Sequence, residues 1–121
     1  MYTAYVLTDQ TRNELLGRFP PKFPKVIAHH VTYEFGVPAD SELPADAEIK
    51  VVGYVQDVEG LEALVVTVDG ENRKPDGKFY HITWSLNPDK FKPVDSNTLV
   101  SAKRSTMILP ITIDTTPTLC K

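Results

Sequence analysis

The segment His30-Val31-Thr32-Tyr33 has a near copy later in the chain, His81-Ile82-Thr83-Trp84, and both alternate polar with apolar residues. Such alternation is typical of a half-buried β-strand. Because successive side chains of a strand point to opposite faces, the histidine and the threonine of each copy share one face. The aliphatic and aromatic residues then face the core. We therefore predict strands over Val26–Phe35 and Phe79–Leu86.

The rest of the chain predicts more β-structure and a single helix. Thr8 is a suitable N-cap for a helix over Asp9–Gly17, because its hydroxyl can accept a backbone N–H. Further strands are expected at Tyr2–Leu7, at Glu48–Val58 and Leu61–Val68 as a hairpin, and at Met107–Ile113, where Pro110 indicates an edge strand. Loops are expected at Phe19–Pro24, Gly36–Ala47, Asp69–Lys78 and Asn87–Asn97, and the tail Asp114–Lys121 is expected to fray. About six strands and one helix define an α+β protein dominated by antiparallel β-sheet.

Composition restricts the classes of protein and partner. The 121 residues are 41% hydrophobic and 24% charged, which is ordinary for a single globular domain over residues 1–121. No apolar run approaches the roughly 20 residues needed to span a bilayer and no signal-peptide pattern is present, so no membrane partner is expected. Cys120 is the only cysteine, which excludes an intrachain disulfide and favours a reducing, cytoplasmic setting. A net charge of −3 and a pI near 5.5 suit a short anionic ligand better than duplex nucleic acid.

The two copies of the motif carry the residues for acid–base chemistry if their strands lie side by side. His30 and His81 would then act as the acid–base pair, since the ordinary pKa of histidine is near neutral. Thr32 and Thr83 would donate hydrogen bonds to the oxygens of a phosphate as negative charge develops on them. Two histidines and two threonines arranged in this way can cleave a phosphodiester without a metal or a cofactor. The plain alternative is a pair of half-buried strand histidines with satisfied hydrogen bonds.

The motif segments resemble the 2H phosphoesterase superfamily. The stretch His29-His30-Val31-Thr32-Tyr33-Glu34-Phe35-Gly36 is similar to the strand of that family that carries histidine, valine and threonine and ends in a glycine. The second motif, followed by Lys92-Pro93-Val94-Asp95-Ser96-Asn97, resembles the cyclic phosphodiesterase branch associated with RNA end-healing. The resemblance implies a compact, bilobal, pseudo-twofold α+β fold, here with few helices. It also implies a metal-independent phosphodiesterase that acts on the 2′,3′-cyclic phosphate ends of nucleotides or of short RNA.

Other residues are candidates for binding the substrate. The loop before His81 offers Arg73, Lys74 and Lys78 to a phosphate. Tyr5, Phe23 or Phe19 is a candidate to stack on a base, although packing is the ordinary role of each. His29 should point to the opposite face from His30, which favours a structural role.

Three alternatives follow from the same residues. The substrate can instead be a cyclic nucleotide or cyclic oligonucleotide messenger, as for related phage anti-defence proteins. A zinc site is a second alternative, because His29, His30 and His81 are enough ligands for a catalytic zinc, although adjacent strand histidines chelate poorly together. The third is a non-catalytic module that binds or sequesters nucleotides. The sequence leaves the oligomeric state open.

Overall fold

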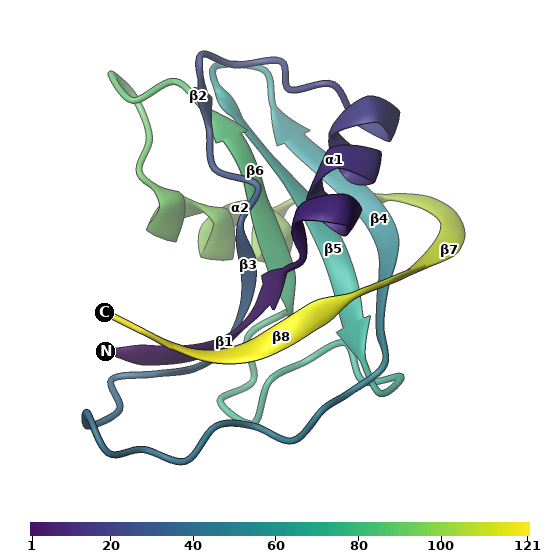
Figure 1. The fold of residues 1–121 in the computed structure, drawn as a ribbon. Helices are drawn as coiled ribbons and strands as arrows, with labels where there is room; N and C mark the ends of the chain where they lie inside the picture. Colours follow the sequence, from purple (N-terminus) through teal and green to yellow (C-terminus); the bar gives the residue numbers. More distant parts are fainter.

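The computed structural model describes all residues, 1–121, and contains two antiparallel sheets with two α-helices (Figure 1). The smaller sheet has the strand order β3-β1-β8 and the larger sheet the order β2-β6-β5-β4-β7. In chain order the elements are β1 (Tyr2–Leu7), α1 (Asp9–Arg18), β2 (Lys25–Val26), β3 (His30–Phe35), β4 (Ile49–Asp57), β5 (Leu61–Val68), β6 (His81–Leu86), a 3₁₀ turn η1 (Pro93–Asp95), α2 (Ser96–Ala102), β7 (Thr106–Ile113) and β8 (Thr115–Cys120). The predicted α+β class with mainly antiparallel β-sheet is confirmed.

The main core lies between the two sheets. Its buried side chains come from both sheets and from α1: Tyr5, Leu7, Leu15, Val31, Ile49, Val51, Leu64, Val66, Ile82 and Trp84. The alternation predicted for the motif strands is seen here, because Val31 and Trp84 are fully buried. Tyr33 is half-buried and packs against the same cluster. Each large apolar side chain buried in this way stabilises the fold by about 1.5–3 kcal/mol.

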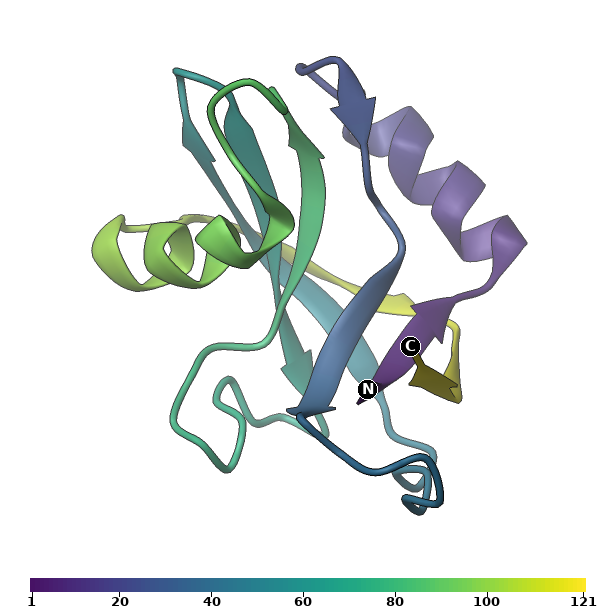
Figure 2. The ribbon, with the colours of Figure 1, turned by 90° about the vertical axis from the view of Figure 1, so that its left-hand side faces the viewer.

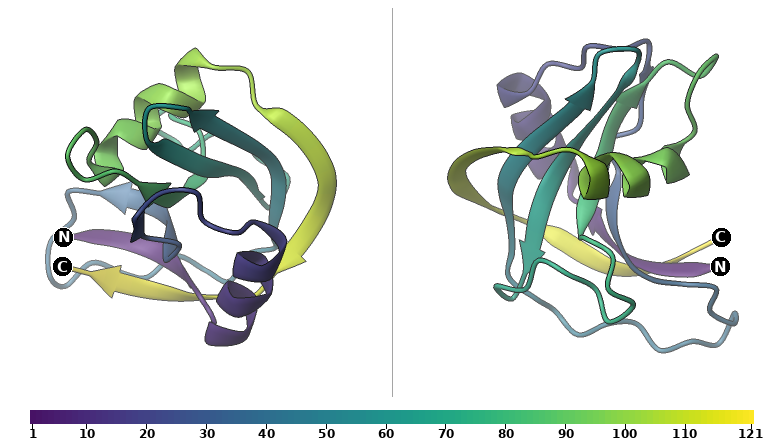
Figure 3. Two further views of the ribbon diagram at one scale, coloured as in Figure 1. Left: turned by 90° about the horizontal axis from the view of Figure 1, so that it is seen from above. Right: turned by 180° about the vertical axis from the view of Figure 1, so that it is seen from behind.

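The two helices cover opposite sides of the larger sheet (Figure 3). The N-cap of α1 is Thr8, as predicted, and its hydroxyl accepts from the backbone N–H of Thr11. The helix ends at Arg18 rather than at Gly17. On the other side, Leu99 and Val100 of α2 pack on a smaller apolar cluster that includes Leu61 and Leu86. None of the helices is long and apolar enough to cross a membrane.

The segment predicted as one strand, Val26–Phe35, is two strands in two different sheets. β2 pairs with β6, and beyond it the N–H groups of Ile27 and Ala28 donate to the carbonyls of Trp84 and Thr83. At Ala28 the backbone takes a φ of 42°, and its carbonyl accepts from Nε of Arg12. The chain then leaves β6 and joins β1 as β3. The single-strand prediction is wrong because the positive φ at Ala28 interrupts the extended backbone.

Two more predictions fail at the C-terminal end. The tail predicted to fray forms β8, which pairs with β1 over all six residues of both strands. The loop predicted over Asn87–Asn97 contains η1 and the start of α2. Both elements have weak local signals, because Pro117 interrupts the threonine-rich run of β8 and because Ser, Asn and Thr are poor helix formers at the start of α2. Their stability comes from partners distant in the sequence, β1 for β8 and the apolar cluster for α2.

A buried carboxylate fixes the proline-rich loop between α1 and β2. Glu62 on β5 is almost fully buried and accepts hydrogen bonds from the hydroxyls of Ser85 and Tyr54. It also accepts from the backbone N–H of Lys22, at 2.9 Å, within that loop. Burial and the hydrogen bond to Glu62 raise the pKa of Tyr54, which therefore stays protonated and donates. These bonds hold the loop against β6, whose own end pairs with β2.

Candidate functional site

The two motif histidines are the first residues of β3 and β6, two strands that contact each other. Figure 2 shows the ribbon around these strands from the side. Ala28 is the last residue whose backbone bonds to β6, at Thr83. The chain turns away from β6 at Ala28, so His30, which begins β3, and His81, which begins β6, lie in different sheets, and the strands β3 and β6 remain in contact. The charge of His81 also lowers the pKa of His30, which requires the rings to be close. The structure thus brings the two histidines together.

His81 is oriented by the backbone of its own strand. Its Nδ1 lies 3.0 Å from the carbonyl oxygen of Phe79, an acceptor only, so Nδ1 carries the proton of this hydrogen bond. Nε2 has no partner within the protein and is the nitrogen left for a ligand. Burial lowers the pKa of His81, the hydrogen bond to Phe79 opposes this, and the nearby charge of Lys74 lowers the pKa further.

His30 is oriented by its neighbour His29. Their Nδ1 atoms are 3.0 Å apart, so one Nδ1 donates and the other accepts. Burial lowers the pKa of His30 to about 4, with smaller effects from the charges of His29 and His81. The prediction that His29 points away from His30 is wrong. Strand alternation does not apply to His29, because β3 begins only at His30, after the turn at Ala28.

The two threonines of the motif differ in their hydrogen bonds. The hydroxyl of Thr32 is half-buried and makes no hydrogen bond within the protein. The hydroxyl of Thr83 lies 2.8 Å from Oγ of Ser96 and 3.3 Å from the carbonyl oxygen of Pro93. Ser96 is fully buried at the start of α2. A hydroxyl has one proton, so Thr83 can donate to a ligand only when Ser96 donates to Thr83.

Of the three cations predicted to meet a phosphate, Lys74 has the position for it. Its side chain is 8% exposed, and its amine makes no hydrogen bond or ion pair in the protein. Burial lowers the pKa of Lys74, and its charge acts on His81. The loop is closed beneath it by backbone bonds from Lys74 to Lys78 and from Gly77 to Lys74, at 2.7 and 2.8 Å. The amine itself still reaches solvent, so an anion could bind to it and offset the cost of burying most of the lysine.

The other two cations of this loop have different roles. The guanidinium of Arg73 lies over the ring of Phe79, 4.3 Å from its centroid, and donates to the carbonyl of Gly77. Lys78 is exposed, and its backbone N–H bonds to the carboxylate of Asp76. The structure therefore assigns Arg73 to the packing of the loop and leaves Lys78 in solvent.

Most of the aromatic residues predicted to stack on a base instead pack or bond within the protein. Tyr5 is only 2% exposed, and its hydroxyl donates to the carbonyl of Ala45, so the stacking prediction for it is wrong. Phe19 stacks on Tyr54 and meets the edge of Trp84. Phe23 is half-buried, and its backbone N–H bonds to Ser85. Ser85 is four residues along β6 from His81, about 13 Å at the rise of a strand, so Phe23 lies away from the histidines.

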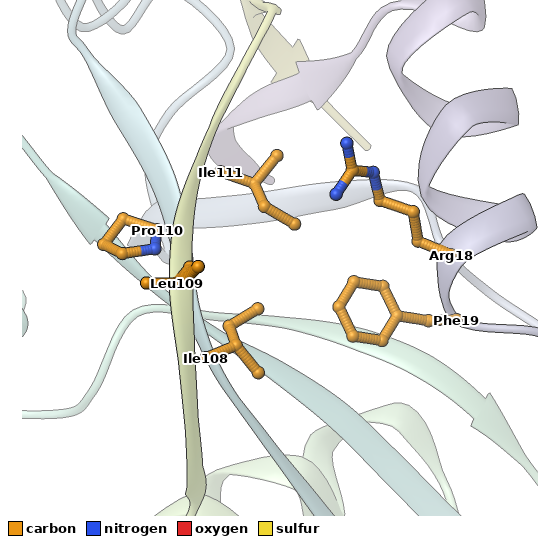
Figure 4. A pocket seen from close by; sticks show the side chains of 6 residues that line it. All are labelled: Arg18, Phe19, Ile108, Leu109, Pro110 and Ile111. Atoms are coloured by element: carbon orange, nitrogen blue, oxygen red, sulfur yellow. The ribbon is translucent and has the colours of Figure 1, made fainter.

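A separate hollow of about 560 Å³ lies between the end of α1 and the edge strand β7. Figure 4 shows Ile108 and Ile111 of β7 pointing toward Arg18 and Phe19. Its lining is mainly apolar and holds no pair of titratable groups that could serve as acid and base. Neither histidine lines this hollow: β5 and β4 separate β6, which carries His81, from β7, and His30 is on β3 of the smaller sheet. Nowhere do three or more His, Cys, Asp or Glu side chains gather closely enough to hold a metal ion.

Comparison with protein-family models, with curated proteins and with solved structures finds no match for this chain. The functional assignment therefore depends on the residues and geometry described above.

Proposed function

We propose that this protein is a metal-independent phosphodiesterase of the 2H type, with the bilobal, pseudo-twofold fold of that superfamily. It would open the 2′,3′-cyclic phosphate of a nucleotide or of an RNA end. The observation that carries the proposal is that His30 and His81 begin two strands that contact each other, β3 and β6, and lie near enough for the charge of His81 to act on His30. The Nδ1 atom of each ring is held by the protein, by His29 and by the carbonyl of Phe79, and each Nε2 is left for a ligand. The lone cysteine supports a reducing, cytoplasmic setting.

The reaction needs one neutral and one protonated imidazole. The neutral histidine removes a proton from water as the water oxygen bonds to phosphorus. The protonated histidine gives its proton to the ribose oxygen as the bond from that oxygen to phosphorus breaks. One water is consumed, and the cyclic diester becomes a monoester. The amine of Lys74 and the hydroxyl of Thr32, neither of which has a hydrogen-bond partner in the protein, would stabilise the charge that develops on the phosphate oxygens.

The lowered pKa values of both histidines have a consequence for this reaction. In the free protein at pH 7 both rings are neutral, so no general acid is present before the substrate binds. A phosphate anion beside the rings favours the charged imidazolium and raises the pKa of the histidines. We expect substrate binding to be coupled to proton uptake, with the acid formed in the complex.

A panel of cyclic substrates tests the proposal. Nucleoside 2′,3′-cyclic phosphates, 3′,5′-cyclic nucleotides and cyclic oligonucleotides are incubated with the protein, and the products are identified. His30→Ala and His81→Ala should each reduce turnover of the 2′,3′-cyclic substrate by about 10²–10⁴-fold, the usual contribution of a general acid or base. Circular dichroism and thermal unfolding check that both variants are folded. Failure to open any 2′,3′-cyclic phosphate would contradict the proposal, and tight binding without turnover would favour a binding module.

A further inference from the structure

Two aromatic rings continue from His30 toward the rim of the smaller sheet. The ring of Tyr2 on β1 lies 5.1 Å from the ring of His30, centroid to centroid. The ring of Phe35, at the end of β3, lies 5.9 Å from Tyr2 and is tilted from it by only 11°. We call Tyr2 and Phe35 the aromatic shelf.

An irregularity in the pairing of β1 with β3 puts the shelf on the same face as His30. Val6 pairs with His30, but Tyr2 pairs with Phe35, because the register shifts between Thr3 and Ala4 and leaves one extra residue on β3. Directly paired residues share a face, as do alternate residues of the regular strand β1. Phe35 is thereby turned from the core face, where simple alternation would put it, to the face of His30.

The shelf is fixed in place and open on one side. Phe35 is 78% exposed, which is unusual for a ring of this size. One face of the ring lies over Tyr2, and the exposed remainder of the ring is available to a ligand. The backbone beyond it is held, because the N–H groups of Gly36 and Val37 both donate to the carbonyl of Met1, at 2.9 and 3.0 Å. Gly36 has a φ of 72°, which lets the chain turn away immediately after the ring.

We propose that the aromatic shelf stacks the base of a nucleotide whose phosphate lies between His30 and His81. This inference rests on the proposed function and names the residues that would bind the base of its nucleotide substrate. A nucleotide places base and phosphate on either side of one ribose, and two ring-to-ring steps separate His30 from Phe35. The ring of Phe35 offers no hydrogen-bonding group, so the shelf accepts every base and favours those that stack best.

The experiment compares a substrate that has a base with one that lacks it. Adenosine 2′,3′-cyclic phosphate is assayed beside methyl β-ribofuranoside 2′,3′-cyclic phosphate, with wild-type protein and with Phe35→Ala and Phe35→Trp. Phe35→Ala should lower kcat/KM for the adenosine substrate by about 5- to 150-fold, the usual effect of losing one stacking contact, and Phe35→Trp should restore it. The base-free substrate should be unaffected. Val58→Ala, at an equally exposed apolar residue in the turn between β4 and β5, is the matched control and should change neither rate.

Equilibrium binding separates this inference from the proposed function. Adenosine 3′-monophosphate and ribose 3-phosphate are titrated into each protein by calorimetry, with sedimentation velocity recorded on the same samples. Weaker binding of adenosine 3′-monophosphate alone by Phe35→Ala would support the shelf even if no cyclic substrate were opened. Equal losses for both ligands, or no loss for either, would overturn it. So would a dimer that Phe35→Ala dissociates while nucleotide binding stays unchanged, because Phe35 would then be a contact between two copies.

Discussion

Replacing His30 by glutamine should make the protein less sensitive to acid. The folded state lowers the pKa of His30 from 6.5 to about 4, mainly by burial. Between these two values the unfolded chain binds a proton that the folded protein does not. The free energy of unfolding therefore falls as the pH drops from 6.5 to 4, and above pH 6.5 this contribution is constant.

The size of the effect follows from the gap between the two pKa values. One pKa unit corresponds to about 1.4 kcal/mol, so the penalty at pH 4 is at most about 3 kcal/mol. Because His30 is only partly buried, we expect about 2 kcal/mol. This is a large fraction of the total stability of a small domain, about 5–15 kcal/mol.

Urea unfolding at pH 7 and at pH 4 measures this penalty. Between pH 7 and pH 4 the free energy of unfolding should fall by about 2 kcal/mol more for the wild-type protein than for His30→Gln. The carboxylates titrate in both proteins, so their effects cancel in this comparison. His29→Gln is the matched control. It removes a charge that acts on His30 and the hydrogen bond between the two rings, whereas burial is the larger cause of the lowered pKa, so most of the pH dependence should remain. Equal losses for wild-type protein and His30→Gln would refute the reasoning.

Three further predictions concern the site and its support. The pH profile of kcat/KM should peak below pH 6.5 and fall at higher pH, because both histidines have lowered pKa values in the free protein; a peak above pH 7 would contradict this. Lys74→Met should lower kcat/KM by about 10- to 100-fold. It should also raise the pKa of His81, measured by NMR titration, because the charge of Lys74 lowers that pKa. Lys78→Met should change neither quantity. Glu62→Ala should cost about 2–4 kcal/mol in urea unfolding, because it leaves buried donors of Ser85, Tyr54 and Lys22 without their acceptor; a loss below 1 kcal/mol would show that water replaces the carboxylate.

Local patterns were sufficient for β1, α1, the hairpin of β4 and β5, and β7. β1 has the predicted bounds, Tyr2–Leu7, and the hairpin of β4 and β5 differs from its prediction by a residue at each end of β4. Pro110 correctly indicated that β7 is an edge strand. These features are set by neighbouring residues, through strand periodicity, capping and the missing N–H of proline.

Details of the site depended on contacts between distant segments. His29 meets His30 only because the turn at Ala28 delays the start of β3, and that turn is held by Thr83 and Arg12. Among the three basic residues of one loop, nothing in their spacing distinguishes Lys74, which is mostly buried, from its exposed neighbours.

The amino-acid sequence alone determined that the two motif strands exist and which of their faces carries histidine and threonine, because side-chain direction alternates within a strand. Only the tertiary structure decided what lies beside those histidines. The extra residue on β3 that turns Phe35 toward His30 is defined by pairing with β1, and the partner of a strand is chosen by packing over the whole chain.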